Sequence, residues 1–137
     1  MPIRILEFSG KTERGPRVVL EYGGQILEAY IGNSKYLASP GSPIDAEIAW
    51  DNVVSCRRMQ GKPQSEGIVQ VNPNLYRVVG PIQTPIVSFE DGSTWGYGIT
   101  VLGWESISVT AIEFGGDDGK LGEYVEVLLT GLGFYPT

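Results

Sequence analysis

The sequence lacks histidine and contains a single cysteine, Cys56. Histidine is the most frequent general base at neutral pH, the usual partner of a serine or cysteine nucleophile and the commonest zinc ligand. One cysteine cannot form an intrachain disulfide, and small secreted domains commonly carry several. These shortages predict a protein that is not an enzyme, that needs no metal or other cofactor, and that resides in the cytoplasm.

Long apolar runs and helical patterns are also missing. No apolar run approaches the roughly 20 residues needed to span a bilayer, and the first residues lack the apolar core of a signal peptide. No segment repeats apolar residues at the i, i+3, i+4, i+7 spacing of an amphipathic helix. The 19 glycines and 9 prolines instead indicate many turns between short strands. We therefore expect an all-β protein that does not bind a membrane.

Bases are scarce in the second half of the chain. Residues 1–70 hold eight acids and eight bases, whereas residues 71–137 hold eight acids and only two bases, Arg77 and Lys120. The second half therefore carries the whole formal net charge of −6. Because a surface of one sign repels phosphate backbones and attracts basic partners, the two halves favour different kinds of partner.

What the chain does contain is one arrangement that occurs twice: a strand pair around a tight turn, then a glycine and an alternating strand. Residues 18–31 form the first pair, around Gly23-Gly24, and an alternating strand follows Gly41. Residues 99–112 form the second pair, and Gly122 opens the strand after it. Such turn glycines are typical of small β-barrels. We expect one barrel-like half over residues 1–60, a link over residues 61–71 and an acidic half over residues 72–137, or else a single domain over residues 1–137.

The segment Leu121–Val127, followed by Thr130-Gly131-Leu132, resembles the glycine-initiated strand of the OB-fold, a five-stranded Greek-key barrel. The resemblance is to a fold and not to a family. It implies small closed or partly open barrels, either as two small halves or as one larger barrel or sandwich. It also implies that single-stranded nucleic acid or an oligosaccharide binds on one barrel face, although a fold does not determine a function.

A glycine-rich loop in the second half concentrates carboxylates. This loop and the tyrosine after it form the candidate protein-binding site: Glu113, Asp117, Asp118, Glu123 and Tyr124. Hard cations favour oxygen ligands, but the spacing of these acids does not match the EF-hand pattern. The acidic half and the missing catalytic chemistry predict a non-enzymatic interaction module, such as an inhibitor, an immunity-like protein or a small assembly subunit. We expect its partner to be a protein with a basic or mixed-charge surface.

The alternative is binding of single-stranded nucleic acid through the first half. Its candidate residues are cations that would meet phosphates and tyrosines on which bases would stack: Arg14, Arg17, Tyr30, Lys35, Tyr36, Arg57 and Arg58. Alternation predicts that Tyr30 lies on the more solvated face of its strand and that Trp50 lies in the core. The competing interpretation is that the tyrosines pack in the core and the arginines lie in ordinary solvated loops. Cys56 is interpreted as a structural thiol, because no histidine is present to activate it.

Overall fold

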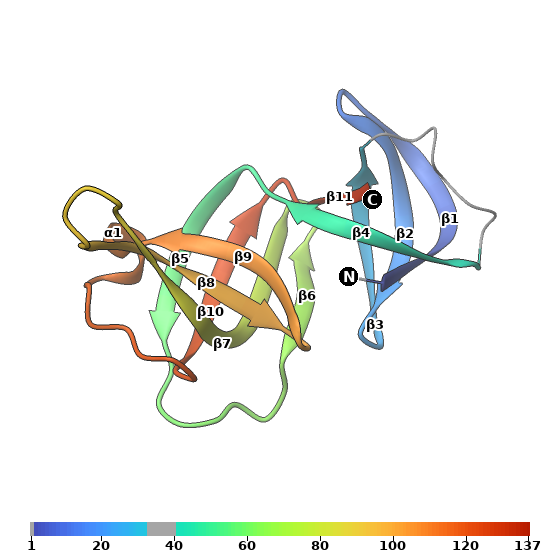
Figure 1. Ribbon diagram of the computed structural model, residues 1–137. Coiled ribbons are helices and arrows are strands. Elements are labelled where there is room, and N and C mark those ends of the chain that lie inside the picture. The colour runs from blue at the N-terminus through green and yellow to red at the C-terminus, as the bar shows by residue number, and fades with distance from the viewer. Residues whose placement is uncertain (1, 33–40) are drawn as a thin grey trace.

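The computed structural model describes residues 2–32 and 41–137, which form two β-sheets and one short helix (Figure 1). Strands from both ends of the chain close into a barrel in the order β1, β2, β3, β11, β4. These strands are β1 (Pro2–Thr12), β2 (Gly15–Tyr22), β3 (Gln25–Ile31), β4 (Pro43–Ala49) and β11 (Gly133–Pro136). β11 runs parallel to β3 and antiparallel to β4, so the last strand of the chain closes the barrel.

The β2–β3 hairpin forms as its sequence predicts. Gly23 and Gly24 adopt positive φ angles of 58° and 81°. The two-residue turn of a hairpin requires such angles, and glycine adopts them without a steric cost. Alternate residues of the two strands are buried in the core: Val18, Leu20, Tyr22, Leu27, Ala29 and Ile31.

The second sheet is strongly curled into a half-barrel, with the strand order β5, β10, β7, β8, β9 and with β6 also paired to β7. Gly80 lies against the carbonyl oxygen of Thr100, so a side chain at this position would collide with the neighbouring strand. This close approach divides the long strand β7. β6 pairs with the part of β7 before Gly80, and β8 pairs with the part after it. The strands are β5 (Asn52–Arg58), β6 (Gly67–Asn72), β7 (Leu75–Val87), β8 (Thr94–Val101), β9 (Trp104–Thr110) and β10 (Tyr124–Thr130).

Helical structure in the described residues is a single turn, α1 (Ala111–Phe114), which follows β9. Thr110 begins it with a capping box: its hydroxyl accepts the Glu113 N–H at 3.0 Å, and the Glu113 carboxylate accepts the Thr110 N–H at 2.8 Å. Gly115 ends it in the left-handed region, with φ at 91°. Neither α1 nor any other described segment is a helix of the length and apolarity that a membrane span requires.

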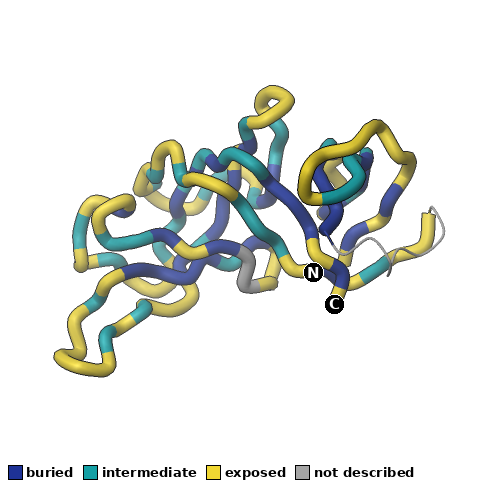
Figure 2. The backbone as a smooth tube through the Cα atoms, turned by 90° about the horizontal axis from the view of Figure 1, so that it is seen from above, coloured by how far each residue is buried: buried dark blue, intermediate teal, exposed yellow. Residues whose placement is uncertain are grey.

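One hydrophobic core joins the barrel and the curled sheet. Polar bonds cross the same junction: the Tyr22 hydroxyl donates to the Val101 carbonyl at 3.0 Å, and the Glu28 N–H donates to Gln70 Oε1 at 2.8 Å. The Tyr76 hydroxyl also donates to the Glu28 carbonyl. Buried residues run through both sheets, and exposed residues occupy the turns and also much of β1 and β5 (Figure 2). The two sheets therefore pack as one unit.

The prediction of an all-β fold built from small barrels is confirmed, with one closed barrel and one half-barrel. The sheets are not divided at the expected link, however. β5, which lies within residues 1–60, pairs with β10 of the curled sheet, and β11 returns to the barrel. Residue alternation within a strand indicates which face is apolar but does not specify the partner strand. The placement of β5 in the curled sheet and of β11 in the barrel therefore depends on tertiary packing.

Replacing Phe134 should test the importance of the last strand. Its side chain is 0% exposed in β11, so Phe134→Ala leaves a cavity where the barrel closes, and we expect the free energy of unfolding in urea to fall by about 3 to 5 kcal/mol. Ile26→Ala is the control, because the Ile26 side chain is 63% exposed and its truncation should cost less than about 0.5 kcal/mol. Equal losses in the two variants would contradict a central role for β11.

Candidate functional site

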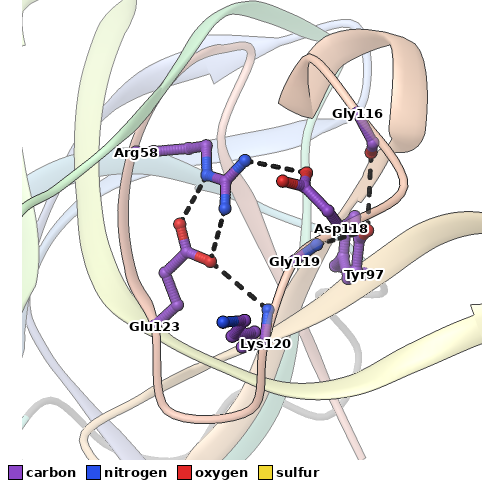
Figure 3. A network of polar contacts seen from close by, with 7 residues as sticks. All are labelled: Arg58, Tyr97, Gly116, Asp118, Gly119, Lys120 and Glu123. Atoms are coloured by element: carbon purple, nitrogen blue, oxygen red, sulfur yellow. Dashed lines mark hydrogen bonds and ion pairs between the residues drawn. The ribbon is translucent and has the colours of Figure 1, made fainter.

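Arg58, the last residue of β5, holds the predicted acidic loop (Figure 3). Its Nε and Nη2 donate to the two carboxylate oxygens of Glu123 at 2.5 and 2.9 Å, and its Nη1 donates to Asp118 Oδ1 at 2.9 Å. The Lys120 N–H donates to the same Glu123 carboxylate at 3.3 Å. Two-pronged bonds between arginine and a carboxylate are among the strong polar contacts in proteins. Arg58 therefore holds both carboxylates in place and offsets one of their two charges.

Two aromatic side chains anchor this loop from the inside. The Tyr97 hydroxyl accepts the Gly119 N–H at 2.9 Å and donates to the Gly116 carbonyl at 3.4 Å (Figure 3). The rings of Tyr97 and Phe114 have centroids 4.5 Å apart, and the Arg58 guanidinium carbon lies 4.6 Å from the Phe114 centroid. A Cβ at Gly119 would lie 2.7 Å from the Tyr97 ring, so this glycine is needed for the close approach. The loop is thus held at several points.

The predicted protein-binding residues differ in their freedom to bind a partner. Hydrogen bonds from the guanidinium lower the pKa of Glu123 below its ordinary value, so this acid is ionised but engaged. Glu113 is exposed and uses its carboxylate in the capping box, and Asp117 is exposed and forms no ion pair with a described residue. The Tyr124 hydroxyl donates to Glu66 Oε1 at 3.2 Å, so Tyr124 contacts the segment before β6. Glu113 and Asp117 are the exposed acids of this set that form no ion pair with a described residue.

The arginines predicted to bind nucleic acid are spread over the molecule. Two lie in the barrel region and two in β5 of the curled sheet. Each has a carboxylate partner: Arg14 with Asp51, Arg17 with Glu28, Arg57 with Glu126, and Arg58 with Asp118 and Glu123. Lys35 and Tyr36 lie outside the described residues. Because each guanidinium would exchange an existing ion pair for a phosphate, these arginines do not form a ready phosphate-binding surface.

Tyr30 is buried, and the prediction that it lies on a solvated face is wrong: it is only 5% exposed. Its ring packs against Gly133 of β11 and meets the Tyr135 ring edge-on, with centroids 5.9 Å apart. The Arg14 guanidinium covers it as well, 5.4 Å from the ring centroid. These neighbours come from other parts of the chain, which alternation within β3 alone does not reveal. A covered ring offers no face on which a base could stack.

Cys56 has the environment of an unreactive thiol. Burial raises its pKa to about 11, and the nearby carboxylates of Glu113 and Glu123 contribute to the same effect. Although Cys56 precedes two arginines in the sequence, Arg58 is directed to Glu123 and Asp118. The thiolate, which is the nucleophilic form, is therefore scarce at neutral pH.

A groove that the sequence analysis missed lies between the β4–β5 junction, β7, β8, the end of β9 and α1. Its volume is about 300 Å³. Trp95 is 55% exposed here, and Trp50, predicted to lie in the core, packs against the core while lining the groove. These segments are far apart in the sequence, and no local pattern connects them. The only feature of the sequence that could have indicated the groove is Trp95, at the start of β8. The lining residues are Trp50, Asp51, Asn52, Val53, Ile86, Trp95, Ser108, Val109, Thr110 and Glu113.

Comparison of the chain with protein-family models, with curated proteins and with solved structures gave no match. Within residues 2–32 and 41–137, no group of three or more cysteine, aspartate and glutamate side chains is placed to hold a metal ion. Inferences about function therefore rest on the contacts, exposure and charges of this chain itself.

The contact between Arg58 and Glu123 should make stability depend on pH. A carboxyl group whose pKa is lowered by folding stabilises the protein above its unfolded pKa, and this contribution disappears as the pH falls through the folded value. For Glu123 the ordinary value is 4.5, so the urea midpoint should decrease as the pH falls below 4.5. Glu123→Gln should remove part of this decrease, whereas Glu7→Gln, which changes an exposed acid on β1, should not. The same pH dependence in all three proteins would exclude this effect.

Proposed function

We propose that this protein is a non-enzymatic interaction module that binds another protein through one end of the curled sheet. This acidic end consists of the β7–β8 turn (residues 88–93), α1 and residues 115–118. The turn and α1 lie at the end of the sheet that is remote from the barrel (Figure 1), and α1 packs against β8. The observation that carries the proposal is the presence there of solvent-facing carboxylates beside exposed apolar side chains.

The exposed apolar side chains of this end are large. Phe89, in the turn, is fully exposed, and Ile112, on α1, is 93% exposed. Trp95 lies next to the turn at the start of β8 and is half-exposed. Large apolar side chains, and aromatic ones above all, supply much of the binding energy of protein interfaces. The exposure of these side chains therefore supports the proposal that the partner is a protein.

The charges of this end support a partner with a basic or mixed-charge surface. Acids here that form no ion pair with a described residue are Glu90, Asp91, Glu113 and Asp117. A hydrogen bond from the Ser93 hydroxyl lowers the pKa of Asp91 and keeps it ionised. Complementary charge raises the association rate and rejects partners of like charge. An inhibitor, an immunity-like protein or a small assembly subunit would use a surface of this kind.

Binding of single-stranded nucleic acid, which the resemblance to the OB-fold suggests, receives less support. The candidate arginines are engaged by carboxylates, and the Tyr30 ring is covered. A formal net charge of −6 also opposes the approach of a phosphate backbone. We therefore regard the closed barrel as the scaffold against which the curled sheet packs.

Affinity capture from native cells, with the tagged full chain and with and without nuclease, should retain a protein partner under both conditions. The test variant combines Ile112→Ala with Asp117→Lys, because both residues are exposed and neither belongs to the capping box or the Arg58 network. We expect this variant to bind the captured partner at least about tenfold more weakly in a titration. Glu113 is left intact, since its replacement would remove a cap of α1.

The matched control combines Ile26→Ala with Glu7→Lys on the barrel, which removes an exposed apolar side chain and reverses an exposed acid. It should bind the partner as the unchanged chain does. Equal binding by both double variants, or loss of the partner upon nuclease treatment, would refute protein binding through the acidic end.

A further inference from the structure

The curled sheet has two edge strands that face the same groove. Among the described residues, β5 pairs with β10 alone and β9 pairs with β8 alone, so each has one unpaired edge. Asn52 and Val53 of β5 line the groove from one side, and residues 108–110 of β9 line it from the other. We call this space between the two strands the seam.

Unpaired strand edges carry rows of backbone donors and acceptors that pair readily with another strand, and proteins commonly cover them or close the sheet. The first sheet of this chain is closed by β11, whereas the second stops short of closure. α1 packs against β5, and β4 contacts β9, but neither supplies a strand that lies between the two edges. The backbone chemistry of the seam therefore matches an extended peptide.

The side chains of the seam add a preference for the residues of that peptide. Trp50, Trp95 and Ile86 supply apolar surface, and Glu113 supplies a carboxylate that forms no ion pair with a described residue, whereas Asp51 is already paired with Arg14. None of the described residues that line the groove is a lysine or an arginine. Tryptophan rings attract cations, and carboxylates pair with them. A long basic side chain, with apolar methylene groups and a charged tip, complements this lining.

The size of the groove agrees with this occupant. Its volume of about 300 Å³ lies at the lower limit for sites that enclose a whole small molecule. It can receive one long side chain with the adjoining backbone, while the rest of an extended segment runs along the edge of β9.

We propose that an extended segment of a partner protein pairs with the β9 edge at the seam and places a lysine or arginine side chain between Trp50 and Trp95. This inference rests on the proposed function, because it specifies how a basic protein partner binds. According to this proposal, the partner is held by backbone hydrogen bonds to β9 and by a side-chain pocket, in addition to charge attraction at the acidic end.

Synthetic peptides of seven residues, the length of β9, test the proposal with the full chain. Each carries a central lysine between alternating β-branched residues, and binding is followed by tryptophan fluorescence and by the exchange rates of the β9 amide protons. We expect at least one peptide to bind with a Kd below about 1 mM and to slow amide exchange along β9. Failure of every peptide to bind at that concentration would overturn the proposal.

Two matched peptides separate backbone pairing from side-chain binding. In the first peptide, methylation of alternate backbone nitrogens removes strand hydrogen bonds without changing the side chains. In the second, replacement of the central lysine by glutamate reverses the side-chain charge and leaves the backbone donors intact. Each change should weaken binding at least about tenfold. Unchanged binding of the methylated peptide, or equal binding of a blocked single lysine, would show a pocket for a small cation and would overturn strand pairing.

Variants of the protein complete the test. Trp95→Ala should weaken peptide binding at least about fivefold, whereas Ile26→Ala, an exposed apolar truncation on the barrel, should leave it unchanged. Thermal unfolding verifies that both variants are folded. A natural partner that depends on Ile112 and Asp117 without any change in β9 exchange would refute the seam and leave the proposed function intact. Peptide binding at the seam, together with a captured partner whose affinity is unchanged by Ile112→Ala and Asp117→Lys, would refute binding through the acidic end and leave the seam intact.

Discussion

The structure depends on the insertion of β11 between β3 and β4. Without it, both of these barrel strands would have an unpaired edge, and the interior that Phe134 occupies would be open. Because β11 follows β10 directly after residues 131–132, barrel closure also constrains the position of β10. β5, which follows β4, then pairs with β10, and the Asp51 N–H donates to the Thr130 carbonyl at 2.8 Å where the two sheets meet. One strand thereby couples both sheets.

The pairing of β5 with β10 rearranges the charges of the molecule. Along the chain, eight of the ten bases belong to the first half, and the unbalanced acids belong to the second. In the fold, Arg57 meets Glu126 across the paired strands, and Arg58 meets Glu123 in the loop just before β10. Exposed ion pairs add little stability by themselves, but they remove charge from the surfaces on which a partner could bind. Around α1 and the β7–β8 turn, carboxylates still face solvent beside exposed apolar groups.

The two sheets differ in whether their edge strands are paired. The barrel uses a strand from the end of the chain to pair every edge, while the half-barrel leaves β5 and β9 facing a groove. Strand edges attract other strands unless they are covered, so an unclosed sheet in an otherwise compact protein is a natural place for a partner. Charge attraction at the acidic end and backbone pairing at the seam would act on neighbouring surfaces, because Glu113 belongs to both.

The sequence by itself determined the all-β class, the β2–β3 hairpin and the acidic, glycine-rich character of residues 113–123. These features arise from alternation and turn glycines, which act between neighbours in the chain. Only the tertiary structure decided that Arg58 binds Glu123, that β11 covers Tyr30, and that Trp50 and Trp95 line one groove. Each of these contacts joins residues far apart in the sequence. Which strands pair depends on how the shared core packs, and no local pattern encodes that choice.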